Sequence, residues 1–195
     1  MKTSREELLL VAFRLFLTKG YEGTTMTDLA SASGLSKGAF HHHFSRKPDL
    51  FEACVDHFFT GFLPSGEPTE APDAATLVRT LAAGYAEHLA GLLDQGIDLA
   101  SYLRFLLSLF PDRAEWVRDR QQAVEAEMAR LYRSDVADGR VLRPRSPEAF
   151  ARQVTATLEG QGLLWAWAEQ PTAERIRDSF AQCAEGLVDG MSLRG

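Results

Sequence analysis

Apolar residues recur along most of the chain at spacings of three and four positions, which is the period of an α-helix. Alternating runs of β-branched residues, which are typical of strands, do not occur. The first helical segment, residues 4–19, is followed by Gly20, a residue that commonly ends helices. Its apolar face consists of Leu9, Ala12, Phe13 and Phe16. The pattern predicts an all-α protein whose first helix covers residues 4–19.

Start signals divide the following residues into three further helices. Thr25, with Asp28 three positions later, forms a capping-box pattern that begins a short helix. A third helix is predicted to begin at Ser36 and to cover residues 37–44. Pro48, at a first-turn position, begins a fourth helix that is predicted to run to residue 62.

The stretch 64–73 contains three prolines and no large apolar residue, which indicates a linker. It separates an N-terminal unit, residues 1–63, from a larger C-terminal unit, residues 64–195. Beyond the linker, glycine and proline positions divide the helical pattern into five segments. These segments cover about 74–94, 98–109, 112–137, 146–169 and 172–190. The sequence therefore predicts about nine helices.

The balance of charge differs between the two units. The chain of 195 residues has a formal net charge of −6, yet residues 1–50 carry seven Lys and Arg against five Asp and Glu. The remaining residues carry fourteen against twenty-two. Three consecutive histidines, His41, His42 and His43, add to the N-terminal segment. Only this segment is therefore expected to meet a polyanion.

Composition narrows the class of protein further. Hydrophobic residues make up 45% and charged residues 25% of the chain, which excludes a disordered or low-complexity protein. Two cysteines are too few for a disulfide framework and are typical of a reducing cytosol. The longest apolar run is far shorter than a membrane span. We expect a cytoplasmic protein with no membrane association.

The two short helices within residues 25–44, joined by a tight turn at Gly34, have the spacing of a helix-turn-helix. Their apolar residues can pack together, while the other face of the second helix points outward. Small residues at 38 and 39 would let the backbone approach base edges, and Lys37 could donate to guanine acceptors. Hydroxyls and Lys47 suit phosphate contacts. The candidate DNA-binding residues are Thr25, Thr27, Ser36, Lys37, Gly38, Ala39, His41, His42, His43 and Lys47.

Residues 20–51 read GYEGTTMTDLASASGLSKGAFHHHFSRKPDLF and closely resemble the DNA-binding domain of the TetR family of transcriptional regulators. The matching features include the aromatic residue after Gly20, the run Gly34 to Gly38, and the pair His43 and Phe44. The resemblance covers about residues 4–60. One position departs from it, because His41 stands where the family usually has tyrosine. Histidine keeps a ring and a donor but has a shorter reach.

Two apolar stripes mark the last two predicted helices, which would form an αα-hairpin joined near Pro171. In the resembled family such a pair forms a four-helix bundle with its copy in a second subunit, so the resemblance implies a homodimer. The alternative is that both stripes pack inside a single chain. The candidate interface residues are Phe150, Val154, Leu158, Ile176, Phe180, Cys183 and Leu187.

The helices between residues 74 and 169 carry more aromatic residues than a minimal scaffold needs, together with a few polar groups. An apolar pocket with few polar anchors is the usual form of a small-molecule site. The candidate ligand residues are Tyr85, His88, Tyr102, Phe105, Trp116, Gln161 and Trp165. The alternative for each is an ordinary core position. We expect a small apolar or aromatic effector.

Patterns typical of catalytic and metal sites do not occur in the chain. There is no metalloprotease or phosphate-cradling motif. Consecutive histidines on a helix point about 100° apart and cannot converge on one ion. We therefore expect no enzyme activity, no cofactor and no metal. The leading hypothesis is a repressor released from a palindromic double-stranded DNA operator by a small molecule. The alternative is an all-α adaptor protein with a degenerate helix-turn-helix.

Overall fold

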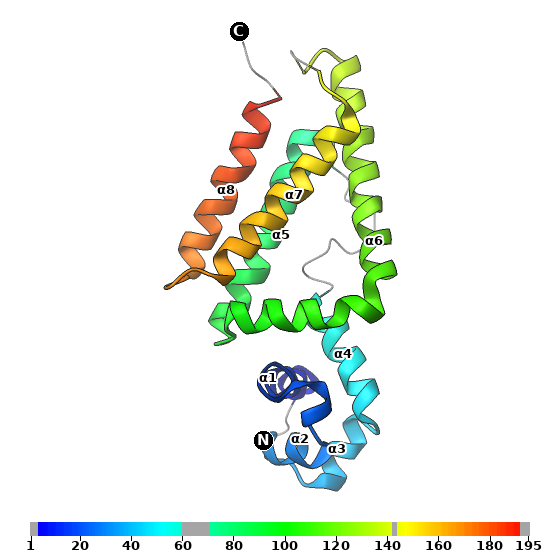
Figure 1. Ribbon diagram of the computed structural model, residues 1–195, viewed down its shortest axis with the longest axis vertical. Helices are drawn as coiled ribbons and strands as arrows, with labels where there is room; N and C mark the ends of the chain where they lie inside the picture. The colour runs from blue at the N-terminus through cyan, green and yellow to red at the C-terminus, as the bar shows by residue number, and fades with distance from the viewer. Residues whose placement is uncertain (1–3, 60–70, 142–143, 192–195) are drawn as a thin grey trace.

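The computed structural model describes residues 4–59, 71–141 and 144–191, and within these ranges it is helical with no strand (Figure 1). The predicted all-α class is confirmed. The helices are α1 (Arg5–Gly23), α2 (Met26–Ala32), α3 (Lys37–His43), α4 (Lys47–Phe59), α5 (Ala74–Asp94), α6 (Leu99–Ala137), α7 (Pro147–Ala166) and α8 (Ala173–Asp189).

The predicted helix starts are confirmed. Ser4, Thr25 and Ser36 are the N-caps of α1, α2 and α3. The side-chain oxygen of each accepts a hydrogen bond from the backbone N–H three residues later. Gly20 interrupts α1 with a φ of 74°, so the main segment ends where the sequence predicts. Residues 60–62 of the predicted fourth helix and most of the predicted linker lie outside the described residues.

Residues 98–109 and 112–137, predicted as two helices, form the single element α6. Figure 1 shows that α6 changes direction sharply part-way along its length. Pro111 is the one proline inside this element and lacks the amide hydrogen that a helix interior uses, which is a common cause of a kink. Within the described residues, the predicted number of about nine helices holds when the two arms of α6 are counted separately.

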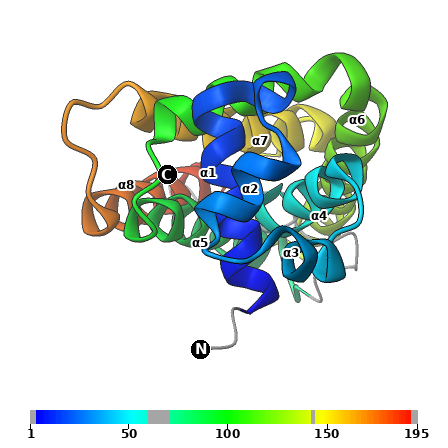
Figure 2. The same cartoon turned by 90° about the horizontal axis from the view of Figure 1, so that it is seen from below.

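The first arm of α6 lies between α1–α4 and the other C-terminal helices, as Figures 1 and 2 show from two directions. Aromatic rings fill the contact. Phe13 of α1 stacks on Phe58 of α4 with ring centroids 4.1 Å apart, and it meets the edge of Phe105 of α6 at 5.4 Å. Phe51 of α4 contacts the same Phe105 at 5.7 Å. One continuous core therefore joins the two predicted units, and the division at the linker stays a prediction.

The C-terminal helices pair as α5 with α8 and α6 with α7. This pairing buries the two apolar stripes that were predicted to face a second chain. Phe150, Val154, Ile176 and Phe180 are completely buried within the single chain, and Leu158 is 1% exposed. Leu187 is also buried, whereas Cys183 is partly exposed. In this single chain these residues have almost no surface left to offer a partner, and their assignment to a dimer interface stays a prediction.

A buried carboxylate, Asp135, ties the far end of α6 to the start of α5. It is 2% exposed, and it accepts a hydrogen bond from the backbone N–H of Ala74 at 2.9 Å. The guanidinium of Arg140 donates to its other oxygen at 2.6 Å and 2.8 Å. Because both partners are donors, removing the carboxylate would leave a buried N–H unsatisfied.

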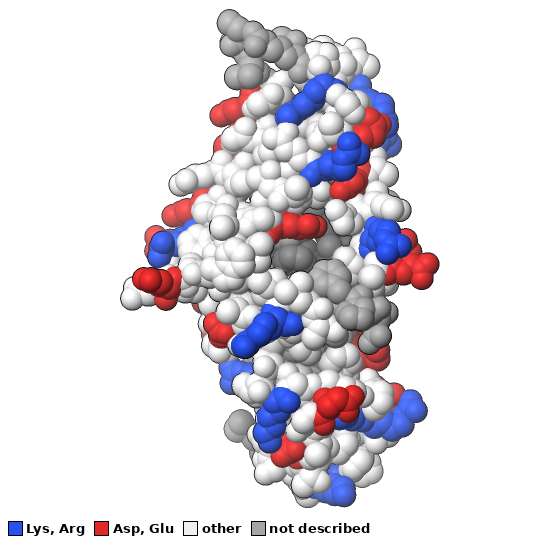
Figure 3. Space-filling model, viewed as in Figure 1, with Lys and Arg blue, Asp and Glu red and all other residues white. Residues whose placement is uncertain are grey.

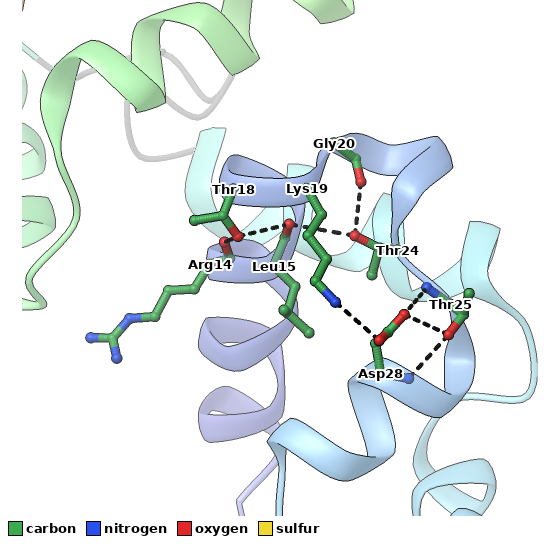
Figure 4. A network of polar contacts seen from close by, with 8 residues as sticks. All are labelled: Arg14, Leu15, Thr18, Lys19, Gly20, Thr24, Thr25 and Asp28. Carbon is green, nitrogen blue, oxygen red and sulfur yellow. Dashed lines mark hydrogen bonds and ion pairs between the residues drawn. The ribbon is translucent and has the colours of Figure 1, made fainter.

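A second polar cluster fixes α2 against the end of α1 (Figure 4). Thr25 accepts a hydrogen bond from the Asp28 N–H at 3.1 Å, and its own hydroxyl donates to Asp28 Oδ2 at 2.6 Å. Lys19 of α1 donates to Asp28 Oδ1 at 3.0 Å. The buried hydroxyl of Thr24 donates to the Gly20 carbonyl at 2.8 Å. These contacts set the angle at which α2 leaves α1.

We expect Asp135→Ala to lower the free energy of unfolding by about 1–3 kcal/mol, because a buried donor loses its charged acceptor. Urea unfolding followed by circular dichroism measures the change. Asp138→Ala is the matched control, since Asp138 contacts the same Arg140 at 2.8 Å but is about half exposed. An exposed ion pair contributes little, so the control should lose less than about 1 kcal/mol. Equal losses would contradict the role given to Asp135.

A pH-dependent contribution is expected from Asp28. Hydrogen bonds from Thr25 and Lys19 lower the pKa of Asp28 to about 2, below the value of about 3.9 in an unfolded chain. A lowered pKa stabilises the folded state above about pH 4, and this contribution is lost as the pH falls from about 4 towards 2. In thermal unfolding, Asp28→Asn should melt lower at neutral pH and should lose less stability across that window than the parent chain.

The matched control for this experiment is Asp178→Asn, which makes the same change at an exposed position of α8. We expect the control to melt like the parent chain at every pH. A parent-like melting profile for Asp28→Asn would contradict the stabilising role of the capping cluster.

Candidate nucleic-acid interface and ligand pocket

Helices α2 and α3 meet at a turn that the sequence fixes through Gly34. Gly34 has a φ of 71°, a left-handed conformation that favours glycine over residues with a side chain. Leu29 of α2 is fully buried and Phe40 of α3 is 1% exposed, so the predicted apolar sides of the two helices do face inward. The packing leaves the opposite side of α3 on the surface, at the end of the molecule seen in Figure 2.

The outward side of α3 consists mostly of exposed polar and small residues. Ser36, Lys37, Gly38, His42 and His43 are exposed, and Ala39 and His41 are partly exposed. A Cβ atom added at Gly38 would have no neighbouring atom within 4 Å. This stretch of α3 can therefore come close to a flat or grooved partner without first moving other side chains.

The residues predicted to contact phosphates differ in whether their side chains already form hydrogen bonds within the protein. Thr25 and Thr27 are both exposed. The hydroxyl and the backbone N–H of Thr25, however, both donate to Asp28 Oδ2, at 2.6 Å and 3.0 Å. Thr25 is therefore a helix cap in this structure, and a phosphate contact through its hydroxyl would require that donor to leave Asp28. Thr27 is not part of this capping box, which consists of Thr25 and Asp28.

Lys47 lies at the start of α4, beside the end of α1. Its ammonium donates to the Tyr21 carbonyl at 2.9 Å and sits 4.1 Å from the centre of the Tyr21 ring. The sequence analysis placed Lys47 at the edge of the helix-turn-helix but did not predict its contact with Tyr21. The presence of an aromatic residue directly after Gly20 could have indicated such a contact. The contact holds the lysine against the protein, with two of its three donors left for another acceptor.

On the face shown in Figure 3, basic and acidic side chains are interspersed rather than segregated. Basic side chains lie at the lower end of the view, where the helices α1–α4 are found. Arg46 is exposed there, but it pairs with Asp49 at 2.6 Å and 2.9 Å. Electrostatic attraction to a polyanion therefore depends on a few local cations more than on a broad basic face.

A narrow pocket lies between α5, α6 and α7; its cavity measures only about 10 Å³ and is partly open to solvent. It is lined by Leu81, Tyr85, Gln121, Val124, Thr155, Leu158 and Glu159. Tyr85 is the predicted ligand residue that lies in this lining. Leu158, predicted for a dimer interface, also lines this pocket. Sequence reasoning missed Glu159, although a carboxylate next to Leu158 on an apolar helix was a signal.

The other six ligand candidates lie outside this lining. His88 contacts the hydroxyl of Tyr102 through Nε2 at 2.8 Å, and burial lowers the pKa of His88 to about 4, so its ring is neutral near pH 7. Trp165 donates to the Ser179 hydroxyl at 2.7 Å. The remaining three are Phe105 in the aromatic contact with α1, Trp116 beneath the Arg120 guanidinium at 5.2 Å, and Gln161, which is partly exposed on α7.

Residues 4–59, 71–141 and 144–191 contain no group of three or more His, Cys, Asp or Glu side chains placed to hold a metal ion. In the same part of the chain, no helix combines the length and the apolar character that crossing a membrane requires.

Comparison with known proteins identifies the N-terminal region. The sequence model described as bacterial regulatory proteins, tetR family, matches residues 8–54, which include α2 and α3. The transcriptional repressor AcnR of Corynebacterium glutamicum is 33% identical over 133 residues, covering 68% of this chain and 52% of AcnR. The repressor KstR2 of Rhodococcus jostii is 42% identical over 59 residues, or 30% of this chain and 27% of KstR2. The chain spans about half the length of AcnR.

Solved structures share the fold over nearly the whole chain. The TetR family transcriptional regulator PfmR from Thermus thermophilus superimposes with a TM-score of 0.67 at 24% identity, and all of both chains is covered. AibR, solved in complex with isovaleryl coenzyme A and operator DNA, gives a TM-score of 0.53 at 19% identity over 91% of this chain and 95% of AibR. The match to residues 8–54 places the N-terminal region in the tetR family of bacterial regulatory proteins, and the solved structures share the helical fold of the whole chain.

Proposed function

We propose that the protein is a DNA-binding transcriptional regulator, a repressor that acts in the cytoplasm, and not an enzyme. The observation that carries the proposal is the exposed side of α3, which follows a tight turn and presents Lys37 beside the small residues Gly38 and Ala39. A helix of this kind fits the major groove of DNA. The family match over residues 8–54 supports the same reading.

The residues of the interface divide into two roles in this proposal. Lys37 points from the first turn of α3, where a side chain can reach guanine acceptors in the major groove. Thr27, Ser36 and Lys47 flank α3 and would contact phosphates, which position the protein without reading sequence. His41 is partly exposed on α3 and would contribute a ring contact at the edge of this surface.

We further propose that the protein binds a palindromic operator as a homodimer, because two recognition helices must meet successive major grooves about 34–36 Å apart. With the predicted stripes buried, the contact is assigned to the outer side of the C-terminal end of α7. Leu164 of α7 and Trp167, the C-cap residue that follows it, are 59% and 69% exposed, next to Leu163. Exposed apolar side chains that adjoin one another mark association surfaces, and tryptophan is enriched at their centres.

A small-molecule effector completes the proposal. The pocket between α5, α6 and α7 is the assigned site, with Tyr85 in its wall. AibR was solved with isovaleryl coenzyme A and operator DNA, so at least one protein of this fold accommodates both kinds of ligand. The effector would release DNA by favouring a conformation in which the two recognition helices no longer match the grooves.

Binding to the DNA upstream of the protein's own gene tests the main proposal. We expect Lys37→Ala to cost about 1–3 kcal/mol at the specific site and to relax preference at one base pair. Lys47→Ala should weaken specific and random DNA alike and reduce the salt slope by about one. Fluorescence anisotropy at several salt concentrations measures both effects.

The matched control for the lysine variants is Arg130→Ala, which removes an exposed cation far from α3 on α6. Its binding should equal that of the parent chain. Identical losses for Lys37→Ala on specific and random DNA would contradict base contact by Lys37. Failure of the parent chain to retain any fragment from a genomic DNA selection would contradict the DNA-binding proposal itself.

The oligomeric state tests the assigned dimer surface. We expect the parent chain to have twice the 21.6 kDa mass of one chain in light scattering. Leu164→Glu and Trp167→Glu should give monomers, because a charge would be buried without a partner in the interface. Leu107→Glu is the control, since Leu107 is 56% exposed on α6 and should leave the dimer intact. A monomeric parent at micromolar concentration would refute the homodimer.

A further inference from the structure

The pocket between α5, α6 and α7 has a carboxylate in its otherwise apolar and neutral wall. Glu159 of α7 lines it together with the side chains of Leu81, Val124 and Leu158. Burial, and then the negative charge of Glu125, raise the pKa of Glu159 above its ordinary value. The surroundings of Glu159 therefore disfavour its negatively charged form. A positively charged group beside it would stabilise that form.

A second carboxylate, Glu125 of α6, lies directly behind the pocket wall. Thr155 and Gln121, which both line the pocket, donate to Glu125 Oε1 at 3.0 Å and 3.2 Å. Both donors are neutral, so they satisfy hydrogen bonds without cancelling the charge. The two polar side chains of the wall are thus directed to Glu125, and the electrostatic character of the pocket is set by two glutamates.

An aromatic ring completes the site. Tyr85 of α5 is buried in the pocket wall and is held from behind by Phe180, with parallel rings 6.1 Å apart. Its pKa is raised by burial and, to a lesser extent, by the negative charge of Glu159, which places the two side chains near each other. The face of an aromatic ring attracts cations. The nearest arginine along α6, Arg120, has its guanidinium over Trp116 at 5.2 Å.

The position of the pocket allows a ligand to widen it. Helix α5 packs mainly against α8, and α6 packs mainly against α7, so the pocket lies on the seam between two helix pairs. The cavity there measures only about 10 Å³, so a ligand larger than a water molecule must widen the seam. A ligand entering this seam separates two packed pairs and does not have to break either one.

We propose that this pocket binds a small amphipathic cation, in which an amine or quaternary ammonium group is attached to an apolar or aromatic body. The cationic group lies between the Glu159 carboxylate and the Tyr85 ring, and the body lies against Leu81, Val124 and Leu158. An anionic amphiphile of the same size meets repulsion from both glutamates. This inference specifies the effector class of the proposed regulator and rests on the assignment of the effector to this pocket.

Three probes that differ in charge but little in shape test the inference: 4-phenylbutylamine, 4-phenylbutanol and 4-phenylbutyrate. Each is titrated calorimetrically into the full chain near neutral pH, without DNA. We expect the amine to bind at least about tenfold more tightly than the alcohol, and the carboxylate to bind most weakly. Equal affinities for the amine and the alcohol, or no binding by any of the three, would overturn the proposal.

Glu159→Gln localises the effect. It keeps the shape of the side chain and removes a charge that burial disfavours, so the variant should remain folded. We expect the amine to lose about tenfold in affinity while the alcohol is unchanged. Glu125→Gln should cause a smaller loss of the same kind. Glu174→Gln, at an exposed position of α8, is the matched control and should bind all probes like the parent chain.

The outcome can be separated from that of the DNA experiment. A chain that prefers the amine through Glu159 but binds no DNA would support the pocket assignment and refute the regulator. A chain that binds its operator but keeps the amine preference in both Glu159→Gln and Glu125→Gln would refute the pocket assignment alone.

Discussion

The packing of Phe13 is the contact on which the arrangement of the molecule depends. Its ring stacks on Phe58 of α4 and meets the edges of Tyr102 and Phe105 of α6, with centroids 4.1, 6.2 and 5.4 Å away. Three helices from two distant parts of the sequence thereby share one buried ring. Because protein interiors are close-packed, none of these helices can shift far without opening a void at Phe13. The ring therefore holds α1 and α4 in place against α6.

A polar chain runs beside the aromatic contact. His88 of α5 contacts the Tyr102 hydroxyl at 2.8 Å, and that hydroxyl lies 3.5 Å from the Phe58 carbonyl at the end of α4. Burial lowers the pKa of His88 to about 4, so the ring stays neutral at physiological pH. The contact therefore works as a fixed hydrogen bond and not as a charge that switches near pH 7. Tyr85 of the pocket wall lies one helical turn before His88 on α5.

The sequence was sufficient to predict local features such as helix caps and turns. It was not sufficient to predict which helices pack against each other. The caps at Thr25 and Ser36 and the left-handed Gly34 depend on neighbours within a few residues, so their patterns were sufficient. The stripe containing Phe180 showed that one face of α8 is buried, but periodicity does not say which helix covers it. The covering helix is α5 of the same chain. The role of Glu159 likewise depends on α5 and α6 lying opposite it.

The continuity of α6 links the two ends of the molecule in a way that two separate helices would not. Its first arm holds Phe105 against Phe13, and its second arm carries Gln121 and Val124 in the pocket wall. A ligand that moves the second arm must either change the bend near Pro111 or displace the first arm against Phe13. Only displacement of the first arm transmits the movement to α1 and α4. By linkage, any weakening of DNA binding that a ligand causes is matched by an equal weakening of ligand binding by DNA.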